Sequence, residues 1–403
     1  MKSRAWRGGL GLGAVALAAA VASGSRPLGV VGVGFLLAWG VTWLWASLAE
    51  RPVAVALEAS PEQTVEGDRV SLSATVTRSS RIPLGSLALE VTIGRLGRSS
   101  HRLRGHGRVA RARVDLGLLP RGVYATDETE VVVGDLLGLV SVKPPLACER
   151  LTIVVRPRLV ALDGLFSEAG RVGGDGRRLL LRRAAGFDFH SVREYEQGES
   201  LRRVHWPTSA RRGQLMVKEL EDTAHDGVVV LLDCDPAGAV GSPPDSSFDA
   251  AVRAAGSILQ THAARGRGAT LVTTGSDGQV VPVRSARGEL GGAVTCLAAA
   301  CPDARHGLAR VLHANPSVAG TAELVIVTAT LDRAAFSAVL AVAARRATSL
   351  VWVDAASFAA RPTRADTGLL RLASHGIPTA VVRKGDDLAA VLSGRSLGAV
   401  AHG

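Results

Sequence analysis

The sequence predicts three parts in series: a transmembrane helical hairpin, an all-β segment of sandwich type, and an α/β domain built on a parallel sheet. Three observations support this. Apolar runs without charge fill most of residues 1–50, short stretches with a period of two fill residues 51–145, and apolar strands alternate with helical stretches over residues 226–403. Residues 146–225 lie between these parts as a linker that carries an arginine-rich segment.

Two runs without a charged residue, 8–25 and 27–49, predict the membrane helices. A spanning helix needs about 20 apolar residues, so the second run is ample and the first is just sufficient. Trp39, Trp43 and Trp45 cluster towards the end of the second run, where indole rings favour the membrane interface. Since so few residues separate the runs, the sequence predicts a tight hairpin with the lipid bilayer as its partner.

A cleaved signal peptide is the alternative for the first run. Lys2, Arg4 and Arg7 would form its basic region, and the small residues Ala20 and Ala22 its cleavage site. Cleavage there would leave the second run at the very start of the mature chain, so we favour the hairpin. The positive-inside bias then places the N-terminus in the cytoplasm. We expect a multi-pass protein of the inner (cytoplasmic) membrane with its soluble domains in the cytoplasm, and four cysteines in 403 residues agree with a reducing compartment.

The all-β segment is predicted from residues 53–57, 70–76 and 87–93, where apolar and polar residues alternate. Turn chemistry separates these stretches, and a long helical period is missing from the sequence pattern. A small β-sandwich that ends near residues 143–145 is the natural architecture.

The α/β domain begins with the continuous apolar run 228–232, as a strand buried on both faces requires. Residues 246–265 then have helical periodicity. Further strands are expected at 269–274, 280–283, 324–328, 350–353 and 379–382, and further helices at 290–300, 333–346 and 369–375. This alternation predicts a parallel sheet covered on both faces, whose ligands lie beyond the carboxyl ends of the strands.

The loop after residue 232 contains Asp233 and Asp235, two carboxylates that could hold Mg²⁺ or simply cap the loop. Its position resembles that of the metal site of a von Willebrand factor A domain, which reads Asp-x-Ser-x-Ser. Here Asp235 and Ala237 replace the two serines. Because alanine cannot ligate a metal, we expect a degenerate site and no resident cofactor, with Thr328 or Asp332 as the residues that could help to hold Mg²⁺.

The same two carboxylates also resemble those of haloacid-dehalogenase phosphotransferases. That resemblance implies Asp233 as nucleophile and Asp235 as general acid. Thr274 or Thr328 would hold the phosphate, and the site would be completed by Lys384, Asp386 and Asp387. Ala237 and the adjacency of Lys384 to the acidic pair depart from that family, so we expect no catalytic residue and no enzyme activity.

Cys296, Cys301, His306 and His313 have spacings that suggest zinc at first sight. The two cysteines are five residues apart on a predicted helix and would point to different faces, so we expect small buried residues instead of metal ligands. The sequence contains no Walker A motif and is therefore not that of a P-loop ATPase.

The formal net charge is +11, and all but four of the 47 basic residues are arginine. Residues 81–121 contain nine arginines and two acidic residues, and residues 171–218 contain eleven basic and five acidic residues. A basic module that binds nucleic acid or anionic lipid is therefore an alternative function. An aromatic fraction of 4% argues against specific nucleic-acid binding, whereas a lipid interaction through residues 95–113 stays open.

The most specific segment is residues 187–211. Arg202 and Arg203 precede Trp206 by four and three residues, a spacing at which a guanidinium can stack on the indole. Such a cluster either locks the segment onto the α/β domain or forms a docking surface for another protein. We expect Trp206 to be mainly structural and one of the two arginines to make the contact.

This segment resembles the signature of the bacterial membrane-protein family called domain of unknown function 58. The matching residues, which we name the signature residues, are Arg193, Tyr195, Gly198, Glu199, Arg202, His205, Trp206, Ser209, Ala210 and Arg211. The family usually has Asp in place of Glu199. Residues 121–124 and 134–139 match its β-rich part. The resemblance implies a von Willebrand A-like domain and partnership with a MoxR-type AAA+ ATPase. We therefore expect a membrane-anchored, non-enzymatic adaptor or assembly factor that contacts its partner through these residues other than Ala210, together with Arg203.

Overall fold

The structure is a computed structural model of the 403-residue chain. It describes residues 5–61, 63–78, 86–106, 108–135, 140–169, 189–194, 206–220, 227–283, 289–359 and 367–395. The chain forms two compact units, Met1–Val155 and Arg156–Gly403.

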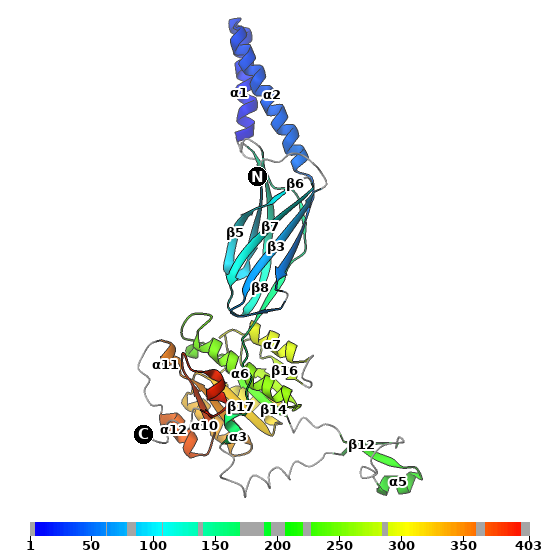
Figure 1. The fold of residues 1–403 in the computed structure, drawn as a ribbon, viewed down its shortest axis with the longest axis vertical. Helices are drawn as coiled ribbons and strands as arrows, with labels where there is room; N and C mark the ends of the chain where they lie inside the picture. The colour runs from blue at the N-terminus through cyan, green and yellow to red at the C-terminus, as the bar shows by residue number, and fades with distance from the viewer. Residues whose placement is uncertain are drawn as a thin grey trace. The chain divides into compact units, whose positions relative to one another are not determined.

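The first unit begins with two apolar helices, α1 (Ala5–Ser23) and α2 (Arg26–Ala49), which lie side by side (Figure 1). They approach closely at Gly32, where a Cβ atom would lie 2.8 Å from the backbone nitrogen of Leu17. Among the described helices, α2 has the length and composition of a membrane span, with 24 residues and a mean hydropathy of 1.8 in its most apolar part. The described apolar stretch of α1, Leu10–Ser23, is shorter than a span requires.

Two β-sheets follow α2. Their strands are β1 (Val53–Ser60), β2 (Thr64–Val65), β3 (Arg69–Arg78), β4 (Ser86–Ile93), β5 (Gly97–Arg102), β6 (Arg104–His106), β7 (Val109–Leu118), β8 (Gly122–Gly134), β9 (Ser141–Val142), β10 (Leu146–Cys148) and β11 (Thr152–Arg156), with a short 3-10 turn η1 (Gly94–Leu96) after β4. One sheet has the order β10-β1-β3-β7-β6 and the other β2-β11-β8-β4-β5, with β9 beside β8. The pairing of β1 with β10 is parallel. Strands β10 and β11 extend this unit beyond residue 145, the end that the sequence predicts.

One hydrophobic core joins the two sheets. Leu72 of β3 and Leu89 of β4 are fully buried in it, and Ala49 of α2 belongs to the same cluster. The alternation of buried and more exposed residues along β4 is the one that a sheet with one covered face requires. The β-rich segment therefore has two layers around a common core, as in a β-sandwich.

The sequence of residues 120–124 has a local structural reason. The hydroxyl of Tyr124 donates to the carbonyl oxygen of Pro120 at 2.9 Å, which ties β8 to the turn before it. The ring lies over Gly122, where a Cβ atom would come within 3.3 Å of Tyr124 Cε2. Glycine at this position therefore lets the tyrosine fold back onto its own strand.

The second unit contains a six-stranded sheet. Its strands are β14 (Val228–Leu232), β15 (Ala269–Thr273), β16 (Val280–Val283), β17 (Glu323–Thr328), β18 (Ala347–Val353) and β19 (Thr379–Val382), in the order β16-β15-β14-β17-β18-β19. The pairings are parallel except that of β16 with β15. The expected parallel direction is wrong for β16, because a tight turn with Gly278 at φ +52° returns the chain directly beside β15.

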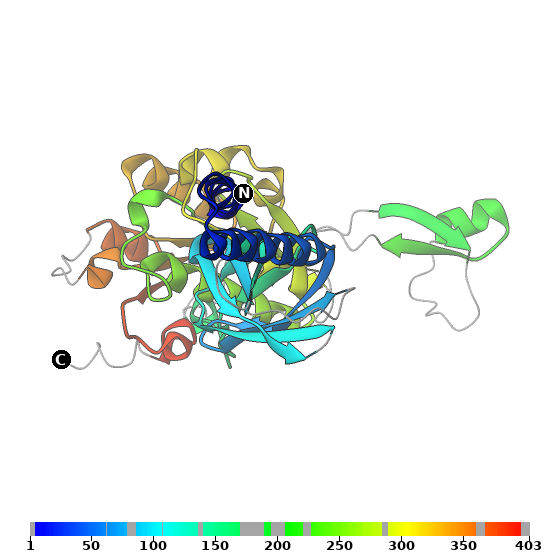
Figure 2. The ribbon, with the colours of Figure 1, turned by 90° about the horizontal axis from the view of Figure 1, so that it is seen from above.

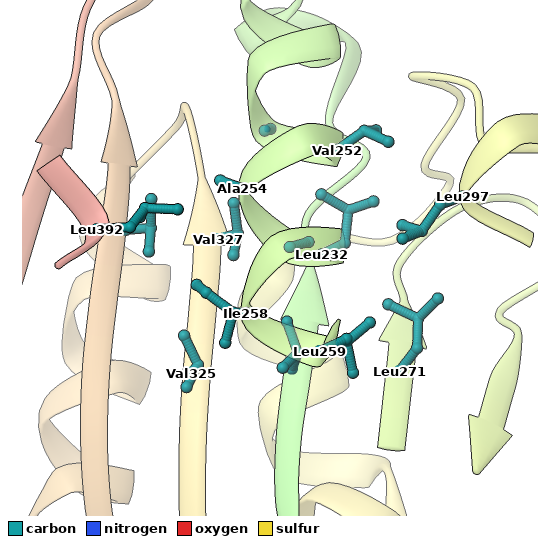
Figure 3. Close-up of a cluster of buried hydrophobic side chains, with 14 of the residues drawn as sticks. Leu232, Val252, Ala254, Ile258, Leu259, Leu271, Leu297, Val325, Val327 and Leu392 are labelled. Carbon is teal, nitrogen blue, oxygen red and sulfur yellow. The ribbon is translucent and has the colours of Figure 1, made fainter. Parts of the chain in front are cut away.

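Helices cover both faces of this sheet. The described ones are α6 (Ser247–Ala264), α7 (Glu289–Ala299), α8 (Leu308–Ala314), α9 (Pro316–Ala319), α10 (Arg333–Ala343), α11 (Ala355–Phe358), α12 (Thr367–Ser374) and α13 (Leu388–Leu392). On one face Ile258 and Leu259 of α6 pack over Leu232, with Leu297 of α7 beside them (Figure 3). On the other face α8, α10 and α12 pack against the alternate residues of the same strands. Each fully buried side chain of this kind contributes about 1.5–3 kcal/mol.

Part of the predicted linker belongs to this unit. Val160 donates its backbone N–H to Ser257 Oγ in α6 at 3.0 Å. Gly256 leaves room for Leu159, since a Cβ atom at Gly256 would lie 2.5 Å from Leu159 Cδ2. The short helix α3 (Phe166–Ala169) adds Phe166 to the core.

Candidate functional site

The carboxyl end of the parallel sheet is the first candidate site. The chain leaves β14 towards β15 on one side and reaches β17 on the other, so the gap between β14 and β17 is the point where the strand order reverses. Open α/β sheets bind ligands at this point. Asp233 follows β14, Thr274 follows β15, and Thr328 ends β17. The structure therefore brings together residues that are far apart in the sequence.

Three threonine hydroxyls surround the Asp233 carboxylate. Thr274 Oγ1 lies 3.0 Å from Asp233 Oδ1, and Thr328 Oγ1 lies 2.7 Å from Oδ2. Thr330 Oγ1 lies 3.3 Å from Asp233 Oδ2 and 3.0 Å from Asp235 Oδ2. We call Asp233, Thr274, Thr328 and Thr330 the Asp233 cluster. It joins the ends of β14, β15 and β17 by hydrogen bonds between side chains.

Asp233 is 5% exposed. Burial raises the pKa of its carboxyl, and the nearby charge of Asp235 acts in the same direction. The hydrogen bonds from Thr328 and Thr274 act against burial by stabilising the charged form. Both oxygens of this carboxyl group therefore already have hydrogen-bond donors within the protein.

Asp235 is used locally. Its Oδ1 accepts from the backbone N–H of Ala237 at 2.9 Å and caps the short turn η4 (Pro236–Gly238). Ala237 supplies no side-chain oxygen, and both oxygens of Asp233 accept from hydroxyls. This set of donors does not fit a magnesium site of the Asp-x-Ser-x-Ser type.

Cys234 lies between the two carboxylates in the sequence and is 1% exposed. Its backbone N–H donates to Thr274 Oγ1 at 2.8 Å. Burial, together with the charge of Asp233, raises the pKa of the thiol to about 12. Because the thiolate is the nucleophilic form, this cysteine is a structural residue.

The remaining residues of the phosphotransferase interpretation lie elsewhere. Lys384 follows β19, which is the third strand along the sheet from β14, about 14 Å away at the usual strand spacing. Asp386 accepts from the backbone N–H of Arg383, and Asp387 caps α13. Asp332, considered as a further ligand, caps α10. The structure thus does not bring these residues to Asp233.

The zinc-like spacing is also dispersed. Cys296 lies in α7, His313 lies in α8, and Cys301 and His306 lie in the connection between these helices. The part of the chain that the structure describes contains no group of three or more His, Cys, Asp or Glu side chains that could hold a metal ion.

The described signature residues lie in a small motif of two strands and a helix. Strands β12 (Phe189–Glu194) and β13 (Met216–Leu220) form an antiparallel pair, and helix α5 (Trp206–Arg212) precedes β13 (Figure 2). Arg193 lies in β12, and Trp206, Ser209, Ala210 and Arg211 lie in α5. The other predicted contact residues lie outside the described residues: Tyr195, Gly198, Glu199, Arg202, Arg203 and His205.

Within this motif, Ser209 has a structural role. Its Oγ accepts from the backbone N–H of Met216 at 2.9 Å, and both residues are buried. This bond fixes α5 against β13. Trp206 at the start of α5 is 63% exposed, so the expectation that Trp206 is mainly structural is wrong. Arg211 is exposed on the same helix.

Three features escaped the sequence analysis. Thr330 belongs to the Asp233 cluster, and a second threonine close behind Thr328 was the available signal. Asp354, buried at the end of β18, lies 3.5 Å from Nε of Arg383. His262 of α6 is fully buried, and neither of its ring nitrogens has a hydrogen-bond partner among the described residues. No local sequence signal distinguishes these last two from ordinary surface residues.

Comparison with known proteins agrees with the signature. An uncharacterized protein of Bacillus subtilis (strain 168), YeaD, is 26% identical over 227 residues, which cover 54% of this chain and 55% of YeaD. The chain thus aligns with little more than half of that relative. Among solved structures, Cwp6 from Clostridium difficile aligns with 74% of this chain and 37% of its own, at 9% identity and a TM-score of 0.15. The sequence model of the family "Protein of unknown function DUF58" matches residues 191–358, a region that contains most of the segment with the signature, as the resemblance predicts.

Proposed function

We propose that the protein is a membrane-anchored, non-enzymatic adaptor or assembly factor that acts with a MoxR-type AAA+ ATPase. The observation that carries the proposal is the exposure of Trp206 and Arg211 on α5, within the family region. Trp and Arg are the residue types that most often anchor protein–protein contacts. Because Trp206 is 63% exposed, its side chain adds little to the core, and contact with a partner would bury it.

The α/β unit is proposed to be a degenerate von Willebrand A-like domain. Counted from β14, its strand order is 3-2-1-4-5-6 with the third strand antiparallel, which supports this proposal. The engaged Asp233 carboxylate and Ala237 support a domain without a working metal site. We expect millimolar Mg²⁺ to leave its melting temperature unchanged and the protein to show no phosphatase turnover.

The anchor is proposed to be the pair α1 and α2, as a hairpin in the cytoplasmic membrane with the β-sheets of the first unit and the whole second unit in the cytoplasm. The apolar length of α2 supports a span. The close approach at Gly32 is the kind of contact by which two helices pack within a bilayer. Four free cysteines support the cytoplasmic placement.

Site-specific crosslinking in intact membranes tests the proposal. A photo-crosslinking amino acid at position 211 should capture the AAA+ ATPase, identified by mass spectrometry. The same group at position 370 is the control, because Leu370 on α12 is 66% exposed but lies outside the signature segment. Capture of the ATPase at 211 and not at 370 supports the proposal. No ATPase at 211, or equal capture at both positions, contradicts it.

A further inference from the structure

The edge of the first β-sheet carries arginines that face each other. Arg104 of β6 lies directly opposite Arg111 of β7, and both side chains are exposed. Gly105 allows the edge strand β6 to come close to β7, because a Cβ atom at this position would collide with the backbone of Val109 and Ala110. Like charges directly opposite each other on a sheet are unfavourable unless something compensates them.

At the other sheet, two cations have carboxylate partners within the protein. Arg98 pairs with Glu90 and with Glu130, and Lys143 Nζ lies 2.6 Å from a carboxylate oxygen of Glu130. On the first sheet, among the described residues, no carboxylate lies within ion-pair distance of Arg104, Arg111 or Arg113. Arg113 donates only to a neutral partner, Ser71 Oγ, at 3.1 Å.

The strand register places these arginines near the end of α2. In the first sheet, Ala56 of β1 pairs with Thr75, Thr75 pairs with Arg111, and Arg111 pairs with Arg104. Ala56 is three residues, or about 10 Å, from Val53, where β1 begins just after α2. Arg108 lies closer to that end, because its carbonyl oxygen accepts from the N–H of Arg78, the register partner of Val53.

The acidic residues of these strands lie farther from α2. Glu58 pairs with Ser73, and Asp115 pairs with Ser71, both beyond the row of Arg104 and Arg111. Glu50 at the end of α2 and Glu149 after β10 are the exceptions, and an arginine, Arg51 or Arg150, follows each of them directly. The end of the sheet next to α2 is therefore predominantly cationic, within about one Debye length of the proposed membrane surface.

We propose that Arg104, Arg108 and Arg111, here called the basic face, bind the headgroups of anionic phospholipids beside the membrane anchor. This inference rests on the proposed span of α2. The headgroup phosphates would compensate the facing arginines and hold the β-rich unit against the bilayer. Each arginine close to an anionic membrane surface contributes about fivefold to such an interaction.

The test measures lipid retention by the full chain. The protein is reconstituted into vesicles of equal parts phosphatidylglycerol and phosphatidylcholine and re-extracted in mild detergent, and both lipids are counted per chain. The wild type should retain more phosphatidylglycerol than phosphatidylcholine, and the excess should fall between 50 and 500 mM salt, as expected for roughly 10 Å screening at 0.1 M. The double variant Arg104→Glu/Arg111→Glu should lower the excess at least about fivefold.

Arg69→Glu is the matched control for the single variant Arg111→Glu. Arg69 is also exposed but lies at the opposite end of β3, paired with Leu118, so its reversal should leave the excess unchanged. The neutral variants Arg104→Gln and Arg111→Gln, each checked for a cooperative melt, give a second series that should show about half the effect. The proposal would be overturned if Arg69→Glu and Arg111→Glu lowered the phosphatidylglycerol excess equally. It would also be overturned if neither the Glu variants nor the Gln variants lowered that excess.

Membrane anchoring is measured separately in the same samples. All variants should stay in the membrane pellet after alkaline extraction if α2 spans the bilayer. Loss of the wild type from the pellet would contradict the anchor, whereas retention with an unchanged lipid ratio would contradict the basic face alone. A duplex DNA that removes the lipid excess at equimolar concentration would assign the face to nucleic acid and overturn the lipid proposal.

Discussion

The Asp233 cluster and the signature motif differ in how they use their polar groups. In the Asp233 cluster, a carboxylate that is 5% exposed accepts hydrogen bonds from threonines of neighbouring strand ends. In the signature motif, Ser209 is buried and bonded, while Trp206 and Arg211 on the same helix remain exposed. Topology makes the first region the expected ligand site, yet its polar groups are satisfied by the protein itself.

This difference bears on the proposed contact surface. A site that binds a ligand or performs catalysis keeps reactive groups accessible, and the Asp233 cluster does not. An interaction surface keeps large aromatic and cationic side chains exposed at a cost in solubility, and α5 does so. The Asp233 cluster thus has a structural role, and the exposure of Trp206 and Arg211 supports the proposal that α5 is a contact surface.

Removing the Asp233 carboxyl should have the largest effect on the fold. Asp233→Ala removes the acceptor of the Thr274 hydroxyl and one of the two acceptors within reach of the Thr328 hydroxyl, and it creates a small cavity. We expect a loss of about 4 kcal/mol in the free energy of unfolding of the α/β unit. Denaturant unfolding of the full chain in detergent measures it, and Asp235→Ala, at a more exposed position, is the control with an expected loss below about 1 kcal/mol. Equal losses of stability in Asp233→Ala and Asp235→Ala would contradict the structural role of the Asp233 cluster.

The stability that Asp233 contributes should depend on pH. Because burial raises the pKa of Asp233 in the folded state, its protonated form is favoured by folding. That contribution is fully present below the ordinary carboxyl pKa and is lost as pH rises through the raised folded value. The difference in stability between wild type and Asp233→Ala should therefore grow as pH falls from 7 to 4. A constant difference would show that the carboxyl is not buried as described.

His262 should give a slightly smaller effect, of opposite sign in acid. Burial, helped by the charges of Arg267 and Arg265 and opposed by those of Glu323 and Glu168, lowers its pKa to about 4. Its contribution to stability is present above the ordinary histidine pKa of about 6.5 and is lost as pH falls through the folded value. We expect a loss of about 3 kcal/mol between pH 6.5 and 4 that His262→Leu abolishes. Urea titrations at each pH measure it, and an unchanged acid loss in the variant would assign it to other groups.

Ser209→Ala should have a smaller and local effect. The variant removes the acceptor of the Met216 N–H, which costs about 1–2 kcal/mol for a buried donor. Hydrogen exchange at Met216 should accelerate about tenfold, while exchange in β14 and β17 stays unchanged. Thr208→Ala, on the neighbouring and less buried residue, is the control. Faster exchange throughout the α/β unit would show that the signature motif and the sheet are one cooperative structure.

The parallel sheet could be predicted from the sequence because each strand carries its own signal. The run at 228–232 is apolar throughout, and the structure buries every residue of it. The period of 246–265 likewise predicted α6 to within one residue at each end. These patterns are local, and burial on one or two faces produces them directly.

The Asp233 cluster could be predicted only in part. Asp233 was found from its position after a buried strand, but its partners depend on which strands become neighbours, and that is a property of the whole sheet. The exposure of Trp206 could not be predicted either, since aromatic side chains are buried more often than not. The direction of β16 differs from the predicted parallel sheet for a local reason, because only a turn of a few residues connects it to β15, and a parallel pair needs a longer crossover.

The central claim is that α5 is a contact surface and not part of the core. Trp206→Ala tests it most directly, with melting temperature and co-purification of the AAA+ ATPase measured on the same preparation and Leu370→Ala as the control. Truncating an exposed side chain should change the free energy of unfolding by no more than about 0.5 kcal/mol. Loss of an anchor residue should weaken partner capture about thirtyfold or more. An early melt with capture lost only in proportion to unfolding, or full capture by a stable variant, would contradict the claim.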